Sequence, residues 1–156
     1  MKLDKTVKHY NKTALDELMK NERTYITNYG SYQYLVTGSY FIGIDKKHSF
    51  IKESENPINI KTIIEKIKVS ENEPIITSNI LKDSKNTLRV VEIDDERGNM
   101  IKCYFDDKLL NILLKMESPI IRYSLSEKFP NLSNLVFLDY NDNIVGYLLP
   151  VRYTEE

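Results

Sequence analysis

The C-terminal stretch from Met100 to Arg152 has the most regular pattern in the sequence. It begins with a strand-like run and continues with leucines at helical spacing, which predict a short helix capped by Asp106 or Asp107. Two further apolar runs flank Asn141-Asp142-Asn143, residue types that accept the left-handed geometry of hairpin turns. A short helix set between antiparallel strands is therefore the predicted building unit of this chain.

Earlier parts of the chain show the same alternation of helix and strands. A strand is predicted over residues 2–10, followed by a short helix that Asn11 or Thr13 caps and whose buried face comprises Ala14, Leu15, Leu18 and Met19. A second helix follows Asn59, with a core face of Ile60, Ile63, Ile64 and Ile67. The predicted fold class is α+β, with antiparallel sheets and three short helices. The length suits a single domain over residues 1–156.

Composition limits the function classes. The 22 basic and 23 acidic side chains give a net charge of −1, whereas a dedicated nucleic-acid binder usually has a basic excess. The single cysteine, Cys103, cannot form an intrachain disulfide, which fits a reducing compartment. No apolar run approaches the roughly 18 residues that a membrane span needs. We therefore expect a cytoplasmic protein without a membrane segment.

No pattern of catalytic or metal-ligating residues occurs in the sequence. His9 and His48 lie far apart, and Cys103 has no second cysteine as a partner. The acidic run Asp94-Asp95-Glu96 lacks the alternating ligand spacing of a calcium loop. We therefore expect no catalytic residue, no metal, no cofactor and a non-enzymatic role.

The first and last parts of the chain align with each other as sequences. Tyr10 falls on Phe105 and Leu15 falls on Leu110, each within a predicted strand, cap, helix and meander. The chain is accordingly interpreted as three repeated strand–helix–strands units, at about 1–50, 51–99 and 100–156.

Three runs together resemble the bacterial DNA polymerase III sliding clamp (beta subunit). Tyr104 to Leu113 resembles the helix that opens its last half-domain, and Val145 to Arg152 resembles its C-terminal strand. Pro57 to Ile67, followed by Glu73-Pro74-Ile75-Ile76, is similar to the middle of a clamp domain. The resemblance implies a DNA-clamp-like fold and a phage or mobile-element protein that binds protein partners in DNA replication.

A departure from that family leaves a second function open. A clamp subunit contains several such domains and closes into a ring, whereas this chain is long enough for one. The alternative is a phage inhibitor on a clamp-like scaffold, which binds and blocks a host or defence protein. The expected partner is thus a replication factor or a host or defence factor. Weak DNA binding and homo-oligomerisation both stay open.

The resemblance also implies sites. The family's C-terminal segment helps to form a pocket for peptide motifs, and the matching positions here are Leu148, Leu149, Pro150, Val151 and Arg152. Clamp helices present basic side chains to DNA, and the candidates here are Lys12, Lys20, Lys61, Lys66, Lys68, Lys108 and Lys115. An ordinary solvated helix face is the other interpretation of these lysines.

A tyrosine-rich run provides a further candidate, which depends on residue type alone. Exposed tyrosines suit protein interfaces, although strand alternation is expected to place about half of them in the core. The candidate interface residues are Tyr29, Tyr32, Tyr34 and Tyr40.

Overall fold

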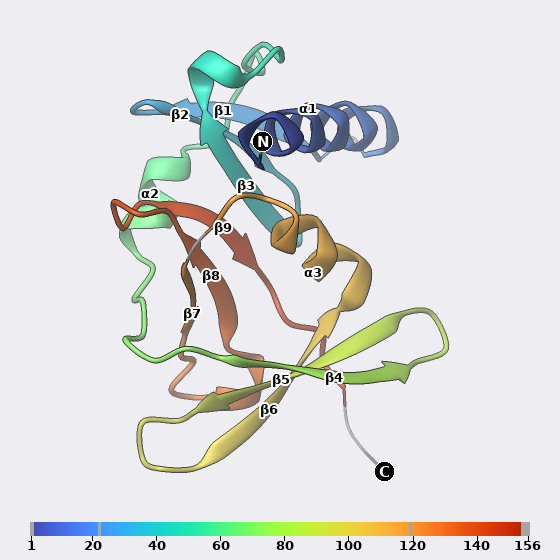
Figure 1. Ribbon diagram of the computed structural model, residues 1–156, viewed down its shortest axis with the longest axis vertical. Helices are drawn as coiled ribbons and strands as arrows, with labels where there is room; N and C mark the ends of the chain where they lie inside the picture. The colour runs from blue at the N-terminus through green and yellow to red at the C-terminus, as the bar shows by residue number, and fades with distance from the viewer. Residues whose placement is uncertain (1, 22, 119, 154–156) are drawn as a thin grey trace.

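The structure is a computed structural model that describes residues 2–21, 23–118 and 120–153. Its elements, in chain order, are α1 (Lys2–Lys20), β1 (Tyr25–Tyr29), β2 (Tyr32–Val36), β3 (Tyr40–Asp45), η1 (Lys46–His48), α2 (Ile60–Glu65), β4 (Ile75–Lys82), β5 (Thr87–Asp94), β6 (Met100–Asp106), α3 (Asp107–Leu114), β7 (Ile120–Ser124), η2 (Pro130–Leu132), β8 (Asn134–Leu138) and β9 (Ile144–Leu148). One antiparallel sheet has the order β1-β2-β3-β9-β8-β7 and the other the order β4-β5-β6 (Figure 1). The predicted α+β class with antiparallel sheets is confirmed.

Several predicted local signals are also confirmed. The Asp106 carboxylate accepts the N–H groups of Lys108 at 2.9 Å and Leu109 at 3.2 Å, which caps α3. The Asn59 side chain caps α2 in the same way. Asp142 takes a φ of 61° in the turn between β8 and β9, as the left-handed geometry of that turn requires.

The first helix differs from its prediction. α1 covers residues 2–20, so the strand predicted over residues 2–10 is wrong. Thr6, Tyr10 and Ala14 are buried at a spacing of one helical turn, and this face packs on the sheet. Asn11 lies inside the helix and does not cap it. Its side chain donates to the Val7 carbonyl at 2.9 Å and accepts the Phe50 N–H at 2.8 Å.

The predicted buried face of this helix is rotated in the structure. Of the four residues predicted to be buried, Ala14 alone is, whereas Leu15, Leu18 and Met19 are 51%, 38% and 86% exposed. Tyr10 takes the central buried position, where its hydroxyl donates to the Gln33 side chain at 2.9 Å. The larger aromatic ring and its buried hydrogen bond thus determine which face of α1 meets the sheet.

Two helices cover one face of the six-stranded sheet. Tyr10 of α1 and Leu110 of α3 belong to one buried cluster, together with sheet residues such as Ile42 and Phe137. The His9 ring donates to the Ile112 carbonyl across 2.9 Å, which joins α1 directly to α3. α2 lies on the opposite face, where its residue Ile60 packs in a second cluster (Figure 1).

Both outer edges of the six-stranded sheet are occupied by the segment between β3 and β4, residues 46–74. At the β1 edge, the Ile26 N–H and carbonyl bind the Ser54 side chain and backbone at 2.8 and 2.9 Å. At the β7 edge, the Tyr123 carbonyl accepts the Ser70 N–H at 2.8 Å. These bonds occupy part of each edge, and the occupied backbone groups cannot pair with another chain.

The three-stranded sheet shares the main core and is tied to the chain end. Val91 of β5 and Phe105 of β6 lie in the same buried cluster as Tyr10 and Leu110. The Val151 N–H donates to the Tyr104 carbonyl at 2.7 Å, so the segment after β9 crosses from one sheet to the other. The unit boundary predicted between residues 99 and 100 falls within this sheet, because β6 pairs with β5.

Candidate functional site

The lysines expected to face DNA are all exposed, but the structure distributes them over two faces. Lys12 and Lys20 are on α1, and Lys108 and Lys115 are on or just after α3, which covers the same sheet face. Lys61, Lys66 and Lys68 belong to α2 and the segment after it, on the opposite face. The seven lysines therefore cannot act as one DNA-facing surface.

The candidate tyrosine interface is also divided. Tyr34 and Tyr40 are buried, so these two side chains cannot contact a partner in this conformation. The Tyr34 hydroxyl donates to the Ile144 carbonyl at 2.8 Å, and burial raises the pKa of this side chain. Tyr29 and Tyr32 are half-buried. Tyr29, Tyr32 and Tyr34 share one face of the sheet, where Tyr34 packs against Phe41, whereas Tyr40 lies in the core on the other face.

The C-terminal segment is partly closed to a peptide, although the Leu149 side chain is exposed. Leu148 is fully buried, and the Leu149 N–H donates to the Ser39 carbonyl at 3.0 Å. Pro150 is half-buried, and Val151 is half-buried against the cluster that contains Tyr104. Arg152 is exposed and lines a hollow of about 220 Å³. Leu148 is therefore core and does not line a pocket, because β9 is an interior strand between β3 and β8.

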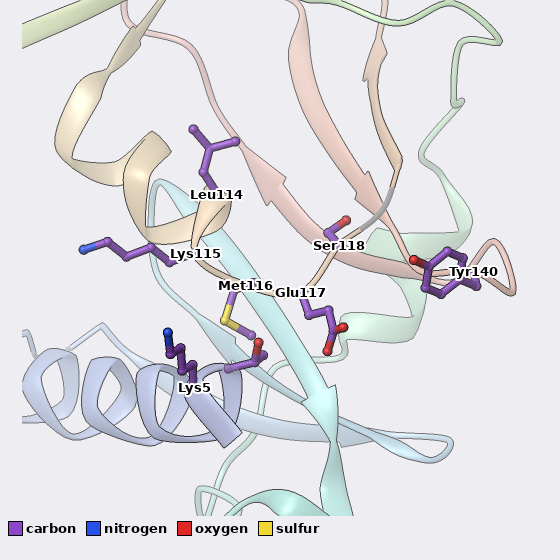
Figure 2. Close-up of a pocket in the computed structure, with 8 residues that line it drawn as sticks. Lys5, Leu114, Lys115, Met116, Glu117, Ser118 and Tyr140 are labelled. Carbon is purple, nitrogen blue, oxygen red and sulfur yellow. The ribbon is translucent and has the colours of Figure 1, made fainter. Parts of the chain in front are cut away.

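A larger cleft lies where the start of α1 meets the connection between α3 and β7. Its volume is about 340 Å³, and Figure 2 shows the residues that surround it. The amino groups of Lys5 and Lys115 lie at one end, whereas Glu117 and Tyr140 lie toward the other. Met116 is buried and contributes the apolar floor.

Charge in this cleft is not neutralised internally. Lys5, Lys115 and Glu117 are exposed, and none of them forms an ion pair in the described parts of the chain. Tyr140 is 81% exposed beside them. Within the described residues, the cleft thus combines two unpaired ammonium groups, one unpaired carboxylate and an accessible aromatic ring.

The turn that presents Tyr140 is held by its neighbour Asp139. This carboxylate accepts the N–H groups of Asn141 and Asn143 at 2.8 and 2.9 Å, and the Tyr32 hydroxyl also donates to it. Burial alone raises the pKa of Asp139, but the hydrogen bonds from Tyr32 and Asn143 outweigh burial and hold the pKa below its usual range. Burial and the same Asp139 contact raise the pKa of Tyr32 to about 12.

This arrangement predicts a pH dependence of stability. Because the folded pKa of Asp139 is below its unfolded value of about 3.9, its contribution is present above that pH and lost as the pH falls through the folded pKa. The variant Asp139→Asn should show a weaker loss of unfolding free energy below about pH 4, measured by urea unfolding across a pH series. An unchanged acid slope in the variant would contradict the assigned hydrogen bonds.

The outer face of α1 is the second notable surface. Lys8, Lys12, Leu15 and Met19 recur at helical spacing and are all exposed, so they form one row on the solvent side, termed the α1 row. Its first half is basic and its second half is apolar. Sequence reasoning named Lys12 and placed Leu15 and Met19 in the core. It did not single out Lys5, Glu117 or Tyr140.

Comparisons with known proteins identify no relative of this chain. No family model, no curated protein and no solved structure matches the chain. Within the described residues, no group of three or more His, Cys, Asp or Glu side chains is arranged to hold a metal ion. None of the helices in the described ranges is long and apolar enough to cross a membrane.

Proposed function

We propose that this chain is a non-enzymatic protein-binding module with a clamp-like scaffold, linked to DNA replication in a phage or mobile element. The observation that carries the proposal is the apolar half of the α1 row. Leu15 and Met19 are at least half exposed on one helix face, and Leu18 extends the same surface. Adjacent exposed apolar side chains on a folded protein mark interaction surfaces more often than isolated ones do.

The arrangement of helices and strands supports the clamp-like part of the proposal. α1 is followed by the meander β1-β2-β3, and α3 is followed by the meander β7-β8-β9. The two meanders meet through the antiparallel pairing of β3 with β9, and both helices lie on one face. The residue-by-residue alignment does not carry over, because Tyr10 lies within α1 whereas Phe105 lies on β6.

The alternative function is an inhibitor that uses the same scaffold to block a host or defence protein. The backbone bonds of Ile26 and Tyr123 favour it over a ring that closes by strand pairing, because they occupy groups on the β1 and β7 edges that such pairing would use. Light scattering that gives a monomer, together with no retention on DNA at low salt, would support the inhibitor. A closed oligomer that retains DNA would support a replication clamp.

A paired substitution tests the α1 row. The double variant Leu15→Glu and Met19→Glu should abolish capture of the partner in an affinity purification from the encoding host. Its unfolding free energy should stay within about 0.5 kcal/mol of that of the unmodified chain, because both positions are exposed and glutamate favours the helix. The measurement is the amount of partner recovered, with unfolding followed by circular dichroism.

The matched control places the same change on the other sheet. Ile75 and Ile80 of β4 are 52% and 48% exposed, so Ile75→Glu with Ile80→Glu adds equal charge at two other exposed apolar positions. This control should recover the partner as the unmodified chain does. Equal recovery with both double variants would remove the α1 row as the binding surface.

A further inference from the structure

We propose that the cleft between α1 and the α3–β7 connection binds a short peptide segment with an acidic side chain at one end and an arginine at the other. The inference rests on the proposed protein-binding function, and it adds a second surface with a defined partner chemistry. The cleft is lined by Lys5, Lys115, Met116, Glu117 and Tyr140, among others, and holds about 340 Å³.

The acidic requirement follows from the lysine end. Lys5 comes from α1 and Lys115 follows α3, and Figure 2 shows both side chains on the same side of the cleft. Neither ammonium group forms an ion pair in the described residues, so each is available to an incoming carboxylate. The His9 contact with Ile112, at 2.9 Å, joins α1 to α3, the helix that Lys115 directly follows. A carboxylate placed between two such groups makes charge-assisted hydrogen bonds.

The arginine requirement follows from the opposite end. Glu117 is exposed and has no basic partner within the described chain, and Tyr140 presents its ring from the β8–β9 turn. A guanidinium group stacks on an aromatic face and pairs with a carboxylate at the same time, which an ammonium group does less well. The bonds that Asp139 makes hold this turn in position.

The apolar middle of the cleft favours a peptide over a small anion as its ligand. Met116 forms an apolar floor, and the partly exposed Leu114 also lines the cleft, on the side of Lys115 (Figure 2). The two charged ends are separated by this apolar stretch, so one ligand must carry both charges on a backbone long enough to span them. A short peptide with an apolar residue between its charged residues meets that requirement.

The test uses peptide selection on the purified full chain. Random short peptides displayed on phage are selected on the immobilised chain, and enriched peptides are then titrated by fluorescence polarisation. We expect enrichment of peptides with Asp or Glu separated by an apolar residue from Arg. The variant Lys5→Glu with Lys115→Glu should weaken their binding about tenfold or more. The control Lys61→Glu with Lys66→Glu, on the opposite sheet face, should leave it within about twofold.

A charge exchange tests the orientation of the peptide. Glu117→Lys should weaken the binding of peptides that end in arginine. Replacement of that arginine by glutamate should restore the affinity of these peptides for the variant. Absence of any enriched peptide, or equal binding to the lysine variant and its control, would overturn the cleft proposal. So would the absence of restoration by the exchanged peptide. Circular dichroism of each variant establishes that it is folded.

The outcomes for the cleft and for the proposed function are distinguishable. The double variant Leu15→Glu and Met19→Glu alters the α1 row and should leave peptide affinity unchanged. If peptides fail while capture of the partner still depends on Leu15 and Met19, the cleft proposal is wrong and the protein-binding function stands. If peptides bind as expected but the Leu15→Glu and Met19→Glu variant still captures the partner, the α1 row is not the binding surface. The cleft proposal then stands without it.

Discussion

Replacement of Tyr10 by alanine is expected to lower the free energy of unfolding by about 3–5 kcal/mol, the range for removal of a large buried aromatic side chain. The Tyr10 side chain is fully buried between α1 and the sheet, and its hydroxyl hydrogen bond to Gln33 is lost as well. Such a loss is a large part of the roughly 5–15 kcal/mol that stabilises a typical domain. Urea unfolding followed by circular dichroism measures the change.

An exposed tyrosine provides the control for this prediction. Tyr140 is 81% exposed, so Tyr140→Ala should change the unfolding free energy by no more than about 0.5 kcal/mol. Tyr10→Phe separates the ring from its hydroxyl, and it should lose about 1 kcal/mol for the hydrogen bond alone. If Tyr10→Ala and Tyr140→Ala had equal effects, α1 would not pack through the face that contains Tyr10.

Replacement of Phe105 by alanine is expected to have a similarly large effect, again about 3–5 kcal/mol. Phe105 is buried at the end of β6, in the cluster that both sheets share with α1 and α3. A cavity at this point removes contacts between the two sheets, so a single cooperative unfolding transition should shift as a whole.

Phe50 is the matched control for Phe105. It is 84% exposed in the segment that follows η1, and Phe50→Ala should therefore be nearly neutral. A Phe105→Ala variant that unfolds in two separate transitions would contradict a shared core. The measurement is differential scanning calorimetry of both variants under the same conditions.

Local patterns in the sequence were sufficient where a short-range interaction decides the structure. Asp106 caps α3 through its own side chain, and Asp142 adopts left-handed geometry in a turn of adjacent residues. The apolar runs on either side of Asn141-Asp142-Asn143 likewise correspond to β8 and β9. These features depend on residues that are neighbours in the sequence, so they can be predicted from the sequence alone.

Long-range contacts decided the features that sequence reasoning missed. Residues 2–10 alternate weakly, but Tyr10 reaches Gln33, and Asn11 accepts the Phe50 N–H, and these contacts hold the segment as helix. Leu15 and Met19 looked like core because leucine and methionine usually are. The two helices that form the cleft are brought together by β3 pairing with β9, which no local pattern shows.

Long-range packing also determined where the predicted site residues lie. The C-terminal run was predicted to form a peptide pocket, but β9 lies between β3 and β8, so Leu148 is enclosed. The lysines were grouped by residue type, and the sheet then separated those of α2 from those of α1 and α3. The exposure of Lys12, Lys108 and Lys115 could be predicted from their positions in the sequence. That they lie on the same face of the sheet follows only from the fold.

Photo-crosslinking from the α1 row tests the central claim most directly. A photoreactive residue is introduced in place of Met19, and separately in place of Met100, which is 53% exposed on β6. Both chains are irradiated in complex with the captured partner, and adducts are mapped by mass spectrometry. We predict a partner adduct from position 19 and none from position 100. An adduct from position 100 alone, or no adduct at position 19 while the complex forms, would contradict binding through the outer face of α1.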